Sequence, residues 1–365
     1  MSAIGDATRL QTRDVTAAAR AALGRHDTVV ARWEAAPATH RPDNMTTAAL
    51  EFVRGTTTNG AEFTLFVKTL RPASASPLWP LIPEFDRPNV LAALDWLDEP
   101  RVYRSVLRAD LPNGLRMPRL WHVVETDQQI QMWLEAIEDP RPWDAAAYHR
   151  AATVLGRLNG RWPGPRVAAE LGLQPRALAQ LWYGKTSQFD LPRLADDALW
   201  AHPAFADDRR LRADLGRVVE IVPALIDQLD TLPEGLAHGD ACPANMLHGD
   251  DGIVAVDWSY ASSSAIGSDL GQLLAGAWVS GTADPDAIAP TARSVHDGFV
   301  EGLAAEGVVV AEEAVEHAFV THLLVRAVFD AVATVPDVAS RVGAARVALA
   351  RFAADRALSL QPSVC

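Results

Sequence analysis

The sequence predicts an α+β fold with a β-rich N-terminal lobe, residues 1–137, and an α-rich C-terminal lobe, residues 138–365. Three observations support this prediction. Segments of the first third alternate apolar and polar residues or are rich in β-branched residues, which is typical of strands. Later segments carry apolar residues at helical spacing. A chain of 365 residues is long for one domain and sufficient for two lobes.

The first lobe is expected to begin with a helix, within residues 1–25, that leads into three antiparallel strands. These strands are predicted at 28–37, 46–55 and 61–70. The second and third are joined by "TTTNG", in which Asn59-Gly60 is a strong turn signal. The third strand contains Lys68 in the stretch "FVKTL".

The rest of the first lobe mixes a loop, helices and a further hairpin. "RPASASPLWPLIP" (71–83) holds four prolines and is predicted to be a loop. One helix is expected at 88–97, and another from Glu99 or Pro100, because proline suits a first helical position. "PRLWHVVETDQQIQMWLEAIED" (118–139) predicts two strands that turn at Asp127-Gln128.

The second lobe is predicted to be mostly helical. The expected helices are 145–162, 174–184, 209–229, 267–277, 288–305, 312–333 and 338–358. One stretch differs, "LAHGDACPANMLHGDDGIVAVDW" (236–258). Its two short apolar runs flank Gly249-Asp250-Asp251-Gly252, which is a hairpin signature.

Composition excludes some classes of protein. The net charge of −13 disfavours a nucleic-acid partner, which would need a basic face. The most apolar late run, "VEHAFVTHLLVRAVFDAVATV", carries five ionisable residues, so no membrane span is expected. The N-terminal residues show no signal-peptide pattern. Two cysteines, Cys242 and Cys365, fit a reducing cytoplasm, and Cys242 is interpreted as a packing residue.

The unusual stretch gathers side chains that suit phosphoryl transfer. The predicted hairpin places Asn245, at its start, beside Asp257, at its end, with Asp240 five residues before Asn245. The reaction needs oxygen ligands for Mg²⁺ and a carboxylate close to the acceptor hydroxyl. We therefore predict Asp240 as the catalytic base, and Asn245 and Asp257 as the metal ligands.

A cation for the nucleotide phosphates is the remaining requirement. Only two of the 33 basic residues are lysines, and Lys68 stands on the predicted third strand among apolar neighbours. Glu99 is the candidate partner of Lys68. Because Pro100 disfavours helical dihedrals at the residue before it, Glu84 is kept as an alternative. The other lysine, Lys185, is interpreted as a solvent-facing loop residue.

The stretches "HGDACPAN", "VAVDW" and "IGSDLGQLL" resemble the aminoglycoside phosphotransferase family, which shares the bilobal protein-kinase-like fold with choline kinases. The resemblance extends from about residue 28 to 355. It implies ATP as cofactor, with the backbone of Glu135, Ala136 and Ile137 contacting adenine. It also implies that Asp269 braces the catalytic loop by hydrogen bonds and that His238 packs that loop.

One departure from the pattern concerns the phosphates of the nucleotide. The connection "AAPATHRPDNM" (35–45) contains no glycine, whereas protein kinases cover the phosphates with a glycine-rich loop. The phosphate contacts of this segment therefore remain unassigned.

Together these features predict an ATP- and Mg²⁺-dependent small-molecule kinase that phosphorylates a hydroxyl group. The resemblance implies an aminoglycoside, another hydroxylated antibiotic or an amino sugar as acceptor, bound by residues of 166–230 and 280–355. The acidic balance favours a cationic acceptor. Two alternatives stay open, a nucleotide-binding pseudokinase that regulates a partner protein and an enzyme that transfers AMP to a protein. A role in antibiotic resistance, biosynthesis or sugar metabolism is equally open.

Overall fold

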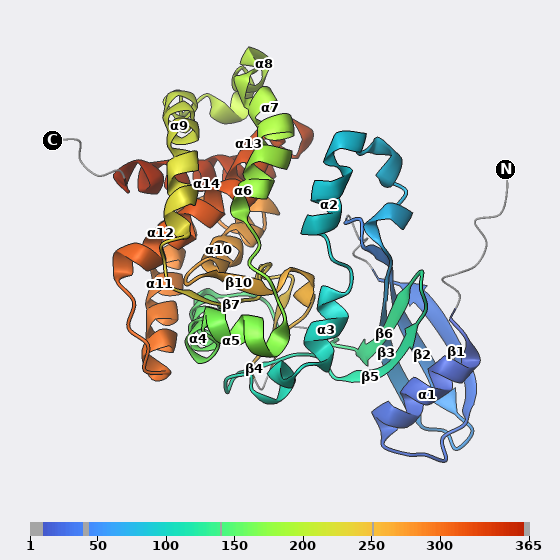
Figure 1. The fold of residues 1–365 in the computed structure, drawn as a ribbon. Helices are drawn as coiled ribbons and strands as arrows, with labels where there is room; N and C mark the ends of the chain where they lie inside the picture. Colours follow the sequence, from blue (N-terminus) through green and yellow to red (C-terminus); the bar gives the residue numbers. More distant parts are fainter. Residues whose placement is uncertain (1–9, 39–43, 139–140, 250–251, 361–365) are drawn as a thin grey trace. The chain divides into compact units, whose positions relative to one another are not determined.

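The computed structural model describes residues 10–38, 44–138, 141–249 and 252–360. The chain separates into two compact units (Figure 1). The first comprises Met1–Arg104 and Met117–Pro140, and the second comprises Ser105–Arg116 and Arg141–Cys365. The predicted α+β class is confirmed, with antiparallel strands in the N-terminal region and mostly helices after it.

The first unit is built on a five-stranded antiparallel sheet in the order β1-β2-β3-β6-β5. Its strands are β1 (Val30–Pro37), β2 (Thr47–Thr57), β3 (Glu62–Leu70), β5 (Leu120–Glu125) and β6 (Ile130–Glu135). The three predicted strands and the predicted hairpin are therefore confirmed. Helix α1 (Thr12–Leu23) packs on the sheet (Figure 1) and buries Val15 and Ala18 against Val53 and Trp133.

Lys68 lies inside this sheet. It is paired with Leu50 of β2 on one side and with Met132 of β6 on the other. The chain leaves β3 through short 3₁₀ turns and reaches α2 (Arg87–Ala93) and α3 (Asp98–Arg104). The predicted helix start at Glu99 or Pro100 is thus within two residues of the observed one.

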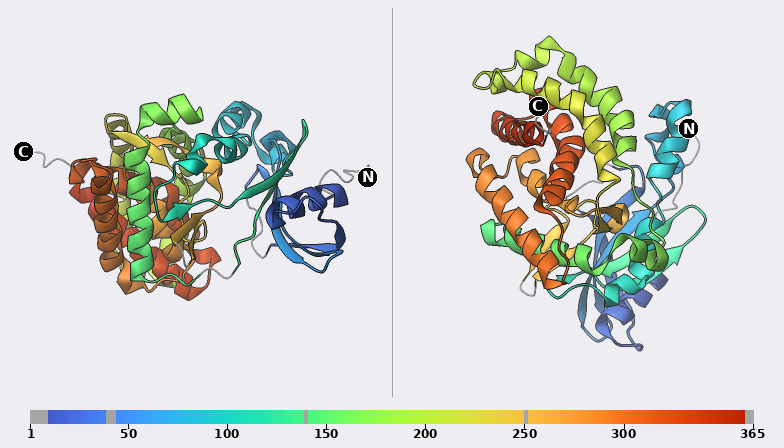
Figure 2. Two further views of the ribbon diagram at one scale, coloured as in Figure 1. Left: turned by 90° about the horizontal axis from the view of Figure 1, so that it is seen from below. Right: turned by 60° about the vertical axis from the view of Figure 1, so that its left-hand side comes forward.

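The helices of the second unit, green to red in the figures, form one bundle (Figures 1 and 2). Its longer helices are α4 (Ala145–Arg161), α9 (Leu211–Leu229), α10 (Asp269–Val279), α11 (Ile288–Ala305), α12 (Glu312–Leu323) and α14 (Ser340–Ser359). Its shorter ones are α5 (Gly164–Arg166), α6 (Leu178–Leu181), α7 (Leu191–Ala195), α8 (Asp197–Trp200) and α13 (Phe329–Ala333). Helices α4 and α11 pack very closely, since a Cβ at Gly156 would lie 2.1 Å from the carbonyl oxygen of Phe299.

Two helix predictions need correction. The helix predicted at 174–184 begins only at Leu178 and continues through a π-helical segment, Trp182–Asp190, into α7. Lys185 is therefore on a helix rather than a loop. The helix predicted at 312–333 is present, but Leu324–Val328 forms a π-helical turn between α12 and α13.

Short strands frame the unusual stretch of the sequence. The predicted hairpin is present as β8 (Met246–Gly249) and β9 (Gly252–Ala255), with residues 250–251 of its turn outside the described residues. Strand β7 (Glu234–Ala237) pairs with β10 (Ser262–Ala265), and β4 (Leu115–Arg116) pairs in parallel with β9. The segment 238–245 is thereby fixed at both ends. In the described parts of the chain, no helix combines the length and apolar character that crossing a bilayer requires.

Candidate active site

The segment 238–245 is a loop that enters from β7 and leaves into β8. Gly239 makes its sharpest turn, with a φ of +81°, which side chains other than glycine rarely adopt. A Cβ at this position would lie 2.0 Å from the backbone oxygen of Tyr260. Both the backbone angle and the close approach therefore require glycine.

Asp269, the first residue of α10, stabilises the loop by accepting hydrogen bonds from two of its backbone amides. Its Oδ2 accepts the backbone N–H of His238 and its Oδ1 accepts that of Gly239, both at 2.8 Å. The side chain is buried, and this burial raises the pKa of Asp269, while its interaction with the ring of His238 and the two backbone hydrogen bonds oppose the shift. The predicted bracing residue thus contacts two successive amides of the loop.

The ring of His238 ties the loop to the residues that follow β9. Its Nε2 lies 3.0 Å from the backbone oxygen of Val256, and its Nδ1 lies 3.3 Å from the backbone N–H of Asp240. These partners assign the proton to Nε2 and a lone pair to Nδ1. The ring also packs against Trp258, with centroids 4.6 Å apart.

Two hydrogen bonds and one ion pair hold the carboxylate of Asp240. Asn245 Nδ2 donates to Oδ2 at 2.8 Å, and Gln272 Nε2 donates to Oδ1 at 2.9 Å. Arg326 Nη2 lies 3.5 Å from the same Oδ1. The sequence analysis did not single out Gln272 or Arg326 for this site.

Asn245 and Asp257 are brought together by the hairpin, as predicted. The backbone N–H of Val256 donates to the backbone oxygen of Asn245 at 2.8 Å. Asp257 follows directly in the left-handed conformation, with φ 58° and ψ 68°, and among the described residues no other non-glycine has a positive φ. Strained backbone of this kind concentrates at functional sites. Ser259 Oγ donates to Asp257 Oδ1 at 2.6 Å.

This donor set suits a divalent cation that is shared with a ligand. Because Nδ2 of Asn245 donates to Asp240, its Oδ1 is the atom oriented to bind a cation, and Asp257 adds a carboxylate. In the part of the chain that the structure describes, no group of three or more His, Cys, Asp or Glu could hold a metal ion. Because a divalent cation such as Mg²⁺ takes about six oxygen ligands, a cation at Asn245 and Asp257 would need further oxygens, such as those of phosphates.

In the first unit, Lys68 forms an ion pair with Glu99. Nζ and Oε2 are 2.7 Å apart, and the two side chains are only 4% and 2% exposed. Pro100 does not prevent this pair, because α3 begins at Asp98 and Glu99 is helical even though the following proline disfavours that conformation. Glu84, the alternative, has a side chain 90% exposed and lies 3.6 Å from Arg87.

The predicted adenine-contacting residues begin at the end of β6. Glu135 is its last residue, and its backbone N–H donates to the oxygen of Arg119 at 2.8 Å. Its Oε2 accepts the N–H of Arg119 at 3.1 Å. Ala136 and Ile137 follow the strand, and the adenine contact of the three residues stays a prediction.

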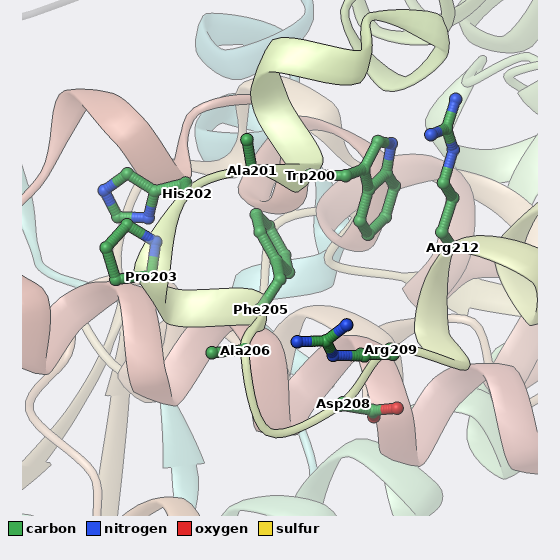
Figure 3. Close-up of a pocket in the computed structure, with 9 residues that line it drawn as sticks. All are labelled: Trp200, Ala201, His202, Pro203, Phe205, Ala206, Asp208, Arg209 and Arg212. Atoms are coloured by element: carbon green, nitrogen blue, oxygen red, sulfur yellow. The ribbon is translucent and has the colours of Figure 1, made fainter.

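A pocket of about 350 Å³ lies elsewhere in the second unit, among residues 200–212 (Figure 3). Trp200, Phe205 and Arg209 line it, with the rings of Trp200 and Phe205 4.8 Å apart. The pocket contains none of the predicted site residues. It does fall within 166–230, one of the two segments predicted to bind the acceptor.

Comparison with known proteins gives a family match and likenesses to solved structures. A family model described as "Phosphotransferase enzyme family" matches residues 87–303, more than half of the chain. No curated protein matches the chain. An aminoglycoside phosphotransferase structure from Alicyclobacillus acidocaldarius is 14% identical, with a TM-score of 0.55, over 98% of this chain and 95% of that one. This likeness confirms the predicted protein-kinase-like fold.

Two further solved structures are similar at lower TM-scores. A spectinomycin phosphotransferase structure with ADP and spectinomycin is 12% identical, with a TM-score of 0.49, over 91% of this chain and 93% of that one. A choline/ethanolamine kinase family protein from Mesorhizobium loti is 15% identical, with a TM-score of 0.47, over 96% and 99%.

Proposed function

The chain belongs to the phosphotransferase enzyme family, and from this premise we propose that it is a kinase that transfers the γ-phosphate of ATP to a hydroxyl group of a small molecule. The match to the family model confirms two predictions made from the motifs, the family and the phosphotransferase class of the enzyme. The nucleotide, the metal ion, the acceptor and the roles of the individual residues are parts of the proposal.

The observation that carries the proposal is the way in which Asp240 is held. A carboxylate offers about four lone-pair sites. Asn245 and Gln272 each donate a hydrogen bond to Asp240, and Arg326 forms an ion pair with its Oδ1, so Oδ2 keeps a lone pair for the acceptor hydroxyl. The loop beneath is fixed by Asp269, so Asp240 can orient that hydroxyl and accept its proton as bonding to phosphorus develops.

The remaining roles concern the nucleotide. Asn245 Oδ1 and the Asp257 carboxylate would hold Mg²⁺, which neutralises charge on the phosphates when bound. Lys68, oriented by Glu99, would bind the α- and β-phosphates, and Glu135, Ala136 and Ile137 would contact adenine. We accordingly assign nucleotide binding to residues 1–137, and catalysis and acceptor binding to residues 138–365.

The proposed acceptor is an aminoglycoside, another hydroxylated antibiotic or an amino sugar. The net charge of −13 favours a cationic acceptor among these. Residues 166–230 and 280–355 would determine which acceptor fits.

The test is ATP turnover over a panel of these acceptors with the native chain and the Asp240→Asn variant. We expect the substitution to lower kcat/KM by roughly 10²- to 10⁴-fold, the usual contribution of a general base. Asp227→Asn, the same chemical change at an exposed position of α9, is the matched control and should keep full turnover. Equal phosphorylation of the best acceptor by native chain and Asp240→Asn would contradict the role of Asp240.

The pseudokinase alternative gives a different pattern of results. A nucleotide-binding regulator would show a thermal shift with ATP and Mg²⁺ but no acceptor-dependent release of ADP. Binding without turnover on any acceptor would therefore favour the regulator over the kinase.

A further inference from the structure

Arg326 is a partly buried cation at the site that the motifs do not account for. It stands in the π-helical turn Leu324–Val328, and its side chain is only 18% exposed. Its Nε is buried and has no hydrogen-bond partner among the described residues. Single π-helical turns are rare and are found frequently at functional sites. A buried donor without a partner costs free energy, so this arrangement calls for a compensating role.

The guanidinium group of Arg326 lies between Asp240 and an aromatic ring. Nη2 is 3.5 Å from Asp240 Oδ1, and the central carbon lies 5.3 Å from the ring centroid of Tyr260. Arg176 approaches the same ring at 4.9 Å and donates to the backbone oxygen of Ser259 at 2.7 Å. Tyr260 therefore supports the arginine by a cation–π contact.

The charges around Arg326 direct it toward Asp240. His322, one turn earlier on α12, is buried, and this burial, with the charge of Arg326, lowers the pKa of His322 to about 3. The imidazole is therefore neutral at pH 7 and neither competes with nor compensates the guanidinium group. Asp269 is already committed to the loop amides, which leaves Asp240 as the ion-pair partner.

Close packing between α10 and α12 fixes the position from which Arg326 approaches Asp240. A Cβ at Gly271 of α10 would lie 2.7 Å from the backbone nitrogen of Leu323, at the end of α12. Gln272 follows Gly271, and Arg326 follows Leu323 by three residues. The same close contact thus brings both donors to Oδ1 of Asp240.

We propose that Arg326 is a positioning residue for phosphoryl transfer, which, together with Gln272, holds the Asp240 carboxylate oriented toward the acceptor hydroxyl. This inference rests on the proposed function. In the reaction, the acceptor oxygen bonds to the γ-phosphorus, and the bond from that phosphorus to the bridging oxygen of ADP breaks. The hydroxyl proton passes to Asp240.

The kinetic test compares Arg326→Met, Arg326→Lys and the native chain. Because Arg326 contacts the base, Arg326→Met should lower kcat roughly 10- to 100-fold, with the KM for ATP unchanged within about twofold. Arg326→Lys keeps the charge and should retain more activity than Arg326→Met. Arg157→Met removes an arginine of similar exposure, 24%, from its ion pair with Glu306 and should leave kcat unchanged.

Several kinetic results would overturn the inference. They are a kcat of Arg326→Met within about threefold of the native value, an equal loss in Arg326→Lys, or a rise in the KM for ATP without a change in kcat. If the native chain turns over no acceptor, the proposed function fails instead, and the kinetic comparison no longer applies.

A second measurement tests the contact without turnover. The melting temperatures of the native chain, Arg326→Met, Asp240→Asn and the double variant form a thermodynamic cycle. If the two side chains stabilise each other, the decreases in melting temperature should not add. The decrease in the double variant should be smaller than the sum of the decreases in the two single variants. Additive shifts would show that the two side chains do not interact and would overturn the inference even for an active enzyme.

Discussion

The ion pair between Lys68 and Glu99 can be tested by removing one charge at a time. Both side chains are almost fully buried, and their charged atoms are 2.7 Å apart. Glu99→Gln would leave the ammonium group of Lys68 in the same buried position without its counter-charge. Breaking a buried pair in this way costs about 3–5 kcal/mol, a large part of the free energy of unfolding of an ordinary domain.

The double substitution Lys68→Met with Glu99→Leu should behave differently. It replaces both charges with apolar side chains, so no unpaired charge stays buried. Such replacements are often neutral or stabilising. We therefore expect the double variant to recover most of the stability that Glu99→Gln loses.

Hydrogen exchange of the β3 amides is the appropriate assay, because it reports the opening of the first unit separately from the second. A loss of about 3–5 kcal/mol should speed exchange of Glu62–Leu70 roughly 10²- to 4 × 10³-fold. Amides of α4 in the second unit provide the internal control. ATP turnover measured on the same samples separates structure from function, since the double variant should fold but lose turnover if Lys68 binds the phosphates.

Two results would refute this reasoning. Exchange in Glu99→Gln that rises less than about fivefold would mean that the pair carries little of the free energy of β3. A double variant that is stable and fully active would mean that the pair is structural only and that Lys68 does not bind the nucleotide.

Three further predictions concern single residues of the fold and the loop. Gly239→Ala should lower the melting temperature far more than Gly60→Ala, because both have φ above +80° but only Gly239 would place a Cβ against backbone, 2.0 Å from the oxygen of Tyr260. The pKa of His322 is about 3 in the folded chain, against an ordinary value of 6.5. At a pH between these two values, His322 is protonated in the unfolded chain but not in the folded chain. As the pH falls from 6.5 to 5, the free energy of unfolding of the native chain should therefore decrease by about 2 kcal/mol more than that of His322→Leu, as measured by urea unfolding. Equal decreases in the two proteins would contradict the assignment. Burial raises the pKa of the Cys242 thiol to about 11, so iodoacetamide at pH 8 should alkylate it roughly 100-fold more slowly in the folded than in the unfolded chain, as followed by peptide mass spectrometry. Comparable rates would show that the thiol is accessible and ionised.

The sequence predicts the longer elements well because each carries its own periodic pattern. Strands β1, β2 and β3 and the long helices of the second unit lie within a few residues of their predicted bounds. The strands β7 and β10 were missed because "EGLA" and "SSSA" have no apolar alternation, and they form only by pairing with each other. The continuation of this helix through 185–190 was missed because Gly184 indicates a helix end, whereas packing of Trp182 on Phe329 continues the helix.

The candidate site could be predicted only where its residues lie in one continuous stretch. The spacing of Asp240, Asn245 and Asp257 predicts a loop and a hairpin, and the structure contains both. Gln272 and Arg326 approach Asp240 from helices far along the chain, and nothing local to them indicates that contact. The doubt about Glu99 arose from a local preference of the residue before proline, which the structure overrides, because Glu99 lies in the first turn of α3.

Helix α10 carries two separate attachments to the same loop, Asp269 to the backbone amides of His238 and Gly239, and Gln272 to the side chain of Asp240. The two residues are three positions apart on one helix, so they move as one body. A displacement of α10 would consequently shift the backbone of the loop and the carboxylate by the same amount, and neither could be adjusted alone. Under the proposed function, mutations in 178–212 that change the acceptor should therefore be tolerated far more readily than mutations in the first turns of α10, because 178–212 supplies none of these attachments.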